Sequence, residues 1–281
     1  MTPGAVEDAL RRMGEGADEA IDLAEAALLC AAHERGNLDL EPSRQHLAEI
    51  ADAMKRASAL DSLKPGDDKL EACCDALRYV LAEKFGYRGD EETYDDLRNA
   101  DLAEVIQRRR GLPVALSILY MHAARSLGWR IEGLNFPGHF VIRIHGDRQA
   151  VILDPFAGGL ARSIQDLRQL LKAQSNDKTE LKPEHFSALD NRQVLIRLQN
   201  NIKVRRIQEG DLKAAERALQ RMLLIAPAHV ELWRESGILN ARLENLLAAR
   251  RAFTRYLELA ETDQQRQRAA RLLQELGQQL H

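Results

Sequence analysis

The sequence predicts an α+β fold that is mostly α-helical, with a small antiparallel sheet followed by C-terminal helical hairpins. Aromatic residues make up only 5% of the 281 residues, while Ala, Leu, Arg and Glu dominate, a composition typical of helical proteins. Two strand-like runs at 138–144 and 149–154 flank a short turn, which indicates a β-hairpin. Beyond residue 190 the sequence repeats with a period of 34, which indicates stacked helical hairpins.

Residues 4–60 predict two or three helices that cover the core. Apolar residues recur at helical spacing between Asp18 and His33, Gly36 breaks this pattern, and Pro42 opens the next helix. A further apolar stripe predicts a helix from Leu70 onward. No chemically suggestive cluster lies in these segments, so we expect their role to be structural.

A buried helix is predicted from Pro113 to Leu127. Proline suits the first turn of a helix, and Gly128 suits the left-handed residue just past its end. Because apolar residues occupy nearly every side of this helix, we expect it to be buried all round. A shorter helix precedes it, with Asn99 or Asp101 as its candidate N-cap.

His139 and Asp154 are predicted to lie side by side on the hairpin. If the turn spans residues 145–148, Ile144 lies opposite Gln149, and His139 lies opposite Asp154. Residues directly opposite in an antiparallel pair hold their Cβ atoms about 4.5–5.5 Å apart on the same face. A register shift of one residue would separate the two side chains.

The helix and the hairpin together resemble the transglutaminase-like, papain-type fold. In that family a Gly-x-Cys opens a buried helix, and a His and an Asp that precedes Pro complete a Cys–His–Asp triad. The matching positions in this chain are Gly111, Gly128, His139 and Asp154, with Arg125 on the family's usual Arg. The resemblance therefore implies that Pro113 occupies the nucleophile position. Proline offers neither a nucleophile nor a backbone N–H for an oxyanion hole.

A longer run of motifs is similar to the bacterial SirB-type family. In chain order the motifs are FGYRGD at 85–90, NADL at 99–102, RRGLP at 109–113, FPGHF at 136–140 and LDPFAGG at 153–159. The resemblance implies a transglutaminase-like core joined to tetratricopeptide (TPR) repeats. It also implies that Pro in place of the catalytic Cys is the usual pattern of this family.

Three consecutive arginines at 108–110 precede the buried helix. Because helix N-termini favour anions, a phosphate site that uses Arg109 and Arg110 is one hypothesis. We favour the alternative that the arginines hold a loop through charge-assisted hydrogen bonds to nearby carboxylates, such as those of Asp95, Asp96 and Glu104.

Ser117 follows Pro113 by one helical turn, and its hydroxyl is a candidate replacement for the missing thiol. We favour instead a buried hydroxyl that donates to the carbonyl of Pro113. Asn99 and Gly111 complete the set of residues expected to line or support the cleft.

The C-terminal segment predicts a TPR array. Eight residues recur 34 residues later, the TPR period: Leu212, Ala214, Ala215, Arg217, Ala218, Arg221, Leu223 and Ala226. We expect helices at 191–208, 211–225, 230–242, 245–260 and 264–278. Such an array presents a groove to a protein or peptide partner.

The sequence divides into three predicted parts. They are a transglutaminase-like core with N-terminal helices at 1–172, a linker at 173–190 and repeats at 191–281. The core is expected to close with a helix at 160–172.

Composition limits the function and the compartment. A net charge of -3 predicts no general affinity for nucleic acid, and three cysteines without a disulfide framework fit a reducing compartment. No signal peptide or membrane-spanning apolar run is visible, so we expect a cytoplasmic protein that does not bind membranes. No His or Cys pair has the spacing of a zinc site and no glycine-rich phosphate loop follows a strand, so we expect no metal and no cofactor.

These features predict a non-catalytic interaction or regulatory protein, a pseudoenzyme whose repeats bind another protein. In it the His139–Asp154 pair is a relic that stiffens the hairpin. The alternative is a hydrolase or transferase in which His139 and Asp154 activate a water or a substrate group as a general base. An open cleft at His139 would favour the alternative.

Overall fold

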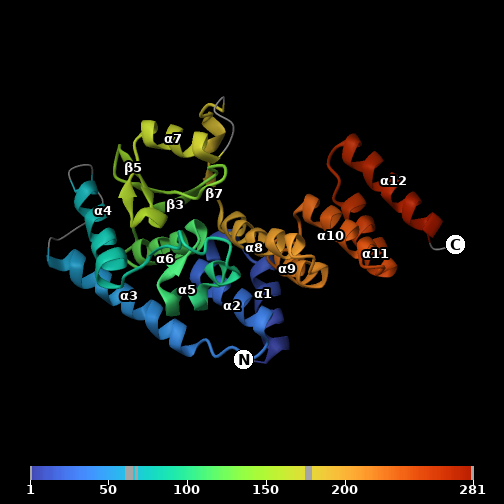
Figure 1. The fold of residues 1–281 in the computed structure, drawn as a ribbon, viewed down its shortest axis with the longest axis horizontal. Helices are drawn as coiled ribbons and strands as arrows, with labels where there is room; N and C mark the ends of the chain where they lie inside the picture. The colour runs from blue at the N-terminus through green and yellow to red at the C-terminus, as the bar shows by residue number, and fades with distance from the viewer. Residues whose placement is uncertain (1, 61–65, 67–68, 175–178, 280–281) are drawn as a thin grey trace.

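The computed structural model of the chain describes residues 2–60, 66, 69–174 and 179–279. Figure 1 shows an elongated molecule, with helices around a small sheet at one end and a row of helices at the other. The predicted fold class is confirmed, because most elements are helices and the five-stranded sheet is antiparallel throughout.

Four helices form the N-terminal part of the core: α1 (Pro3–Glu15), α2 (Leu23–Arg35), α3 (Glu41–Leu60) and α4 (Leu70–Arg78), the last continued by a π-helical stretch at Tyr79–Lys84. The carboxylate of Asp22 starts α2 by accepting the backbone N–H groups of Ala24 and Glu25. The predicted helix start at Asp18 was therefore too early, and Asp18–Ala20 forms a 3-10 turn instead.

The predicted buried helix is confirmed as α6 (Pro113–Arg125), in which every residue except His122 and Arg125 is buried. Gly128 takes the left-handed conformation expected just past the helix, with φ at 72°. α5 (Leu102–Arg108) precedes α6, and its N-cap is Asp101, whose carboxylate accepts the N–H of Glu104 at 3.1 Å.

Five short strands form the sheet of the core. Their order is β6-β5-β4-β3-β7, with bounds Leu160–Ala161, Ala150–Asp154, Ile142–His145, Ile131–Leu134 and Ala188–Leu189. α6 lies against one face of this sheet, and α7 (Ile164–Gln174) packs on the other face (Figure 1). A separate parallel pair, β1 (Arg88–Gly89) and β2 (Arg110–Gly111), lies beside the start of α6.

The register predicted for the hairpin was wrong by two residues. Ile144 lies opposite Val151 rather than Gln149, because the turn is closed one residue later, by the N–H of Gly146 donating to the carbonyl of Gln149. An even shift leaves each side chain on its predicted face of the sheet. β4 begins only at Ile142, so His139 precedes the strand instead of lying on it.

The chain between the hairpin and the repeats also differs from the prediction. Leu160–Ala161 pair with β5, so the helix predicted from residue 160 begins at Ile164. In the predicted linker at 173–190, residues 175–178 lie outside the described residues, and Ala188–Leu189 pair with β3 as the edge strand β7. That part of the segment is built into the sheet.

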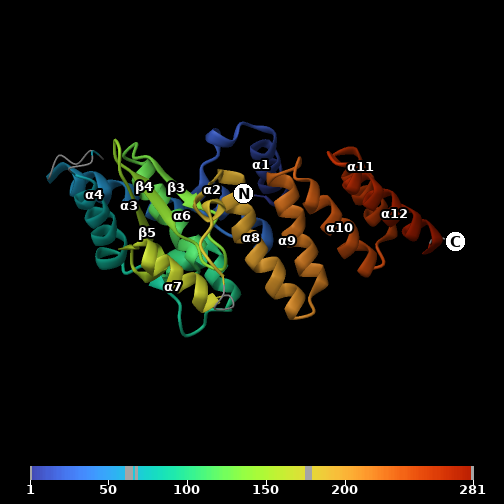
Figure 2. The ribbon, with the colours of Figure 1, turned by 90° about the horizontal axis from the view of Figure 1, so that it is seen from above.

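The helices predicted for the repeat region are confirmed, each end within two residues. They are α8 (Asn191–Gln208), α9 (Leu212–Ile225), α10 (Val230–Arg242), α11 (Leu246–Glu258) and α12 (Asp263–Gln279). Figure 2 shows them side by side in a row that leads away from the core, with α1 packed beside α9. None of the helices in the described part of the chain is both long and apolar enough to cross a membrane.

Candidate functional site

His139 and Asp154 are in direct contact. His139 Nε2 lies 2.9 Å from Asp154 Oδ1, and the two side chains are only 6% and 1% exposed. Because a carboxylate can only accept, Nε2 carries the proton, and Nδ1 is then an acceptor in the neutral ring. The contact forms between the loop before β4 and the end of β5, not between paired strand residues.

Asp154 is held on all sides by donors. Its Oδ1 also accepts the backbone N–H groups of Phe156 and Ala157, and its Oδ2 accepts Nε and Nη2 of Arg162 at 3.1 and 2.8 Å. Burial alone would raise the pKa of Asp154, but the hydrogen bonds and charges of His139 and Arg162 together hold that pKa below its usual value. Sequence analysis did not identify Arg162, which follows β6 directly and reaches Asp154 because β6 pairs with β5.

The His139 ring borders a cavity of about 330 Å³. We call this cavity the His139 pocket; it is lined by Tyr94, Leu112, Pro113, Val114, Gly138, His139, Phe140, Arg197, Asn200 and Asn201. The start of α6, including Pro113, thus lines the same cavity as the imidazole. Among the described residues, no hydrogen bond to Nδ1 of His139 is found.

Helix α8 supplies the opposite wall of the His139 pocket. Arg197 Nη2 donates to the carbonyls of Phe136 and His139, at 2.6 and 2.9 Å, and its guanidinium lies 5.8 Å from the ring centroid of Phe140. Arg197 therefore holds the loop that presents His139. A single cation inside the apolar run at 194–198 was the sequence signal for this role.

Aromatic rings close a further side of the site. Phe156 meets His139 edge-on with ring centroids 5.8 Å apart, and Tyr94 packs on Phe156 in the same manner. Gly89 of β1 permits this packing, because a Cβ there would lie 2.6 Å from the Phe156 ring. The packing of these rings fixes the position of the imidazole between Asp154 and the pocket.

Comparison with known proteins agrees with this architecture. Residues 41–200, more than half of the chain, match the model of the transglutaminase-like superfamily, and residues 202–274 match that of the tetratricopeptide repeat. The chain belongs to the transglutaminase-like superfamily. Its core carries this fold, and its C-terminal helices are TPR repeats.

Individual relatives of this superfamily member cover different parts of it. A "UPF0162 protein" of Xylella fastidiosa (strain 9a5c) is 29% identical over 245 residues, which are 86% of this chain and 85% of the relative. "F-box only protein 21" of Mus musculus is 37% identical over 82 residues, 29% of this chain and 13% of that protein. A crystal structure of menin covers 98% of this chain and 74% of its own at 10% identity, but its TM-score of 0.41 is too low to carry an argument.

The arginines before α6 of this transglutaminase-like core hold loops, but not through the predicted partners. Arg108 donates to Asp90 and to Asn99, each at 3.0 Å. Arg109 donates to the hydroxyl of Tyr87 and lies 2.5 Å from Nε2 of His46. The predicted partners are engaged elsewhere, in the ion pairs Asp95–Arg205, Asp96–Arg98 and Glu104–Arg35.

Neither Arg109 nor Arg110 lines the His139 pocket, so a phosphate site formed by them would lie elsewhere. Arg110 lies in β2 opposite Arg88. Asn99 is fully buried and donates to the carbonyl of Thr93 at 2.7 Å, behind the loop rather than in the pocket. Gly111 lets β2 approach α5, since a Cβ there would lie 2.8 Å from Val105.

Ser117 does not take the predicted hydrogen bond. Its side chain is fully buried, and Oγ has no hydrogen-bond partner among the residues that the structure describes. Ser117 is also absent from the lining of the His139 pocket, and its spacing of one turn from Pro113 does not bring it to the imidazole.

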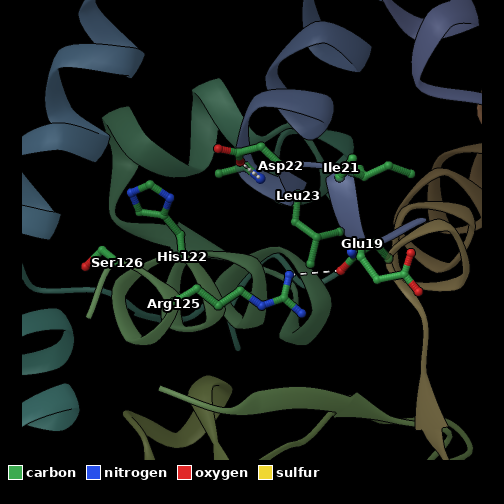
Figure 3. Close-up of a pocket in the computed structure, with 10 residues that line it drawn as sticks. Glu19, Ile21, Asp22, Leu23, His122, Arg125 and Ser126 are labelled. Carbon is green, nitrogen blue, oxygen red and sulfur yellow. Dashed lines mark hydrogen bonds between the residues drawn. The ribbon is translucent and has the colours of Figure 1, made fainter. Parts of the chain in front are cut away.

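Arg125 and His122 lie at the other end of α6, beside a separate cavity of about 570 Å³ (Figure 3). Arg125 donates to Oδ1 of Asn191 at 2.9 Å, and burial lowers the pKa of Arg125. His122 Nε2 lies 3.1 Å from the carbonyl of Leu47, as befits a satisfied core histidine. A helix of 13 residues is about 20 Å long, so this cavity is separate from the His139 pocket.

The described residues contain no group of three or more His, Cys, Asp or Glu side chains that could hold a metal ion. Cys30, Cys73 and Cys74 are all free and buried. The site that remains is the His139–Asp154–Arg162 chain of contacts and the pocket in front of it.

Proposed function

We propose that this protein is a non-catalytic interaction or regulatory protein, in which the transglutaminase-like core has lost its nucleophile and the TPR repeats bind a partner protein. Within the superfamily we place it in the SirB-type group on its motifs at 85–90, 109–113 and 153–159, and we propose a cytoplasmic location. In this proposal the retained residues of the ancestral site are His139 and Asp154, and Pro113 occupies the nucleophile position.

The observation that carries the proposal is that Pro113 and His139 line the same pocket. Acyl transfer in a triad needs a thiol or hydroxyl within hydrogen-bond reach of the imidazole. The residues that line the His139 pocket include no Cys, Ser or Thr, and for the hydroxyl of Tyr94 no hydrogen bond to His139 is found among the described residues. Pro113 also removes the N–H that would stabilise an oxyanion at that position.

The second half of the proposal is supported by a groove along the repeats. A cavity of about 620 Å³ lies between α1 and the helices α9, α10 and α11. Its lining combines apolar surface from Leu223, Pro227 and Trp233 with the charges of Glu216 and Arg251. An apolar floor with a charged edge suits a segment of another protein.

Turnover assays test the loss of catalysis. The full chain should show no hydrolysis or amine transfer with glutamine-containing peptides, peptide amides or thioesters, at any rate above that of a His139→Ala variant. Turnover that disappears on His139→Ala would refute the proposal.

Capture of a partner tests the groove. A protein retained by the full chain from a cell extract should be lost with Arg251→Glu, which reverses a charge in the groove. Arg250→Glu makes the same charge change at the neighbouring exposed position outside the groove and should retain the partner. Equal capture by both variants would contradict binding at this groove.

A hydrolase or transferase that uses His139 and Asp154 as a general base is the second candidate. The observation that favours it is that His139 lines a cavity, with Asp154 orienting its ring and no hydrogen bond to Nδ1 among the described residues. It predicts activity that falls on His139→Ala and Asp154→Asn but survives Pro113→Ala. The same assays therefore distinguish the two candidates.

A further inference from the structure

The His139 pocket has a one-sided charge distribution. None of its ten lining residues is acidic, while the lining includes one guanidinium, one imidazole and two side-chain amides. Arg197 supplies the guanidinium, and among the described residues it has no carboxylate partner, only the carbonyls of Phe136 and His139. A largely buried cation without a counter-ion attracts an anion.

Helix α6 adds further donors to the same space. Leu112 at its N-cap provides no side-chain acceptor, so the first-turn N–H groups of Val114 and Ala115 have no side-chain cap. The positive end of the helix dipole therefore faces the pocket at Pro113.

His139 is the independent sign that a ligand is missing. The side chain is 6% exposed, lines the pocket, and has no hydrogen-bond partner at Nδ1 among the described residues. Since Asp154 holds Nε2–H, an imidazolium ring would present Nδ1–H to the pocket. The charged and titratable groups around the ring are Asp154 with its partner Arg162, Arg197 from α8 and Tyr94 from the loop before α5.

We propose that the His139 pocket binds a carboxylate of a partner protein or peptide, held between His139, Arg197 and the start of α6. A volume of about 330 Å³ is at the small end of ligand pockets, which suits one acidic residue rather than a long peptide. In the complex Nδ1–H of His139 donates to the carboxylate. The inference rests on the proposed function, because it gives the pocket a binding role without a chemical step.

The test uses the full chain and three blocked probes. Acetylated and amidated Gly-Glu-Gly carries only a side-chain carboxylate, acetylated Gly-Gly-Gly with a free C-terminus carries only a terminal one, and blocked Gly-Gln-Gly carries none. NMR shifts of the His139 ring and of the Arg197 Nε–H should change with at least one carboxylate probe, at a Kd on the order of millimolar, and not with the glutamine probe. Which of the two carboxylate probes binds identifies the source of the carboxylate.

Charge reversal in the pocket sharpens the test. Asn200 lines the pocket and has no side-chain hydrogen bond among the described residues, so Asn200→Asp should weaken carboxylate binding about tenfold or more with the fold intact. Gln208→Glu makes the same charge change at the exposed end of α8 and should leave binding within about twofold.

Equal binding of the glutamine and glutamate probes, no binding of either carboxylate, or no effect of Asn200→Asp would overturn the inference. Binding without turnover supports it. Turnover of a probe refutes the proposed function whatever the affinity, whereas absence of binding without turnover overturns only the carboxylate site.

Discussion

Asp154 connects the parts of the candidate site at the scale of single residues. One oxygen orients His139 and starts the turn after β5, and the other takes both donors of Arg162. A buried carboxylate in this position stabilises the fold while it is ionised, because it then accepts from His139, Arg162 and two backbone N–H groups. The pair thus has a structural role whatever the pocket binds.

Asp154→Asn should lower the free energy of unfolding at pH 7 by about 2–4 kcal/mol, because it leaves Arg162 without its counter-ion. The pKa of Asp154 is lower in the folded chain than its ordinary 3.8, so its stabilisation is complete above pH 3.8 and is lost as pH falls through the folded pKa. Urea unfolding of the wild type and the variant should therefore show a difference that is unchanged from pH 7 down to pH 3.8 and shrinks below that pH. A difference that stays constant would contradict this account of Asp154.

Pro113→Cys probes how closely the start of α6 faces the imidazole. A thiol there would lie at a helix N-terminus beside His139, and both features lower a thiol pKa. Alkylation by iodoacetamide at pH 7 should be at least about tenfold faster than in the double variant Pro113→Cys, His139→Ala. The natural cysteines give little background, because burial raises the pKa of Cys30 to about 12, of Cys73 to about 11 and of Cys74 to about 12. The alkylation rates are measured by mass spectrometry. Equal rates in the two variants would show that residue 113 does not lie close to the imidazole of His139.

The sequence predicts the contact between His139 and Asp154 but not the residues that hold them. The pairing was reached through a register that proved wrong by two residues, and the contact is made from a loop. Arg162 and Arg197 approach from β6 and α8, elements whose position depends on the packing of the whole core. Local sequence patterns do not contain that information.

At the scale of elements, β1 is a two-residue strand whose placement depends on Gly89. Its backbone packs on the Phe156 ring, which in turn meets His139. Gly89→Ala should reduce stability by about 1–3 kcal/mol, since the added methyl group must displace the ring. Thermal unfolding and the NMR shifts of the His139 ring should both change.

Gly277→Ala is the matched control for Gly89→Ala. Gly277 lies in α12 with no atom within 4 Å of an added Cβ, so alanine should raise the stability by about 0.5–1 kcal/mol through helix propensity. If Gly89→Ala were as harmless as Gly277→Ala, the close packing of β1 on Phe156 would not exist.

Helices could be predicted to within two residues in the repeats because their signals are local. Asp190 and Asp211 cap α8 and α9, and the 34-residue period fixes the phase of the apolar faces. The strands β6 and β7 have two residues each and no alternating pattern, so their pairing with β5 and β3 depends on the assembled sheet. Because β7 has no alternating pattern of its own, the segment at 173–190 that contains it resembles a linker in sequence.

At the scale of the whole molecule, buried polar contacts attach the repeats to the core. Arg192 of α8 donates to the carbonyls of Met13, Gly14 and Gly16 at the end of α1 and pairs with Asp18. These bonds satisfy the exposed end of α1 and direct α8 along the core. Arg192 therefore ties α8, which lines the His139 pocket, to α1, which lines the groove.

Arg221 is the most deeply buried polar residue that joins the repeats to the core. Its equivalent in the next repeat provides a matched control for a stability measurement. The Arg221 side chain is fully buried, and it donates to Glu34 of α2 at 2.5 Å and to Gln199 of α8 at 2.8 Å. Arg221→Met should cost about 2–4 kcal/mol, because it leaves Gln199 without this partner and Glu34 with only the longer and more exposed ion pair to Arg217, at 3.7 Å. Arg255, its equivalent one repeat later, is 46% exposed, and its one ion pair among the described residues is with Glu258. Arg255→Met should therefore change stability by less than about 0.5 kcal/mol. Urea unfolding of both variants measures the difference, and equal effects would show that the repeats do not depend on the core through Arg221.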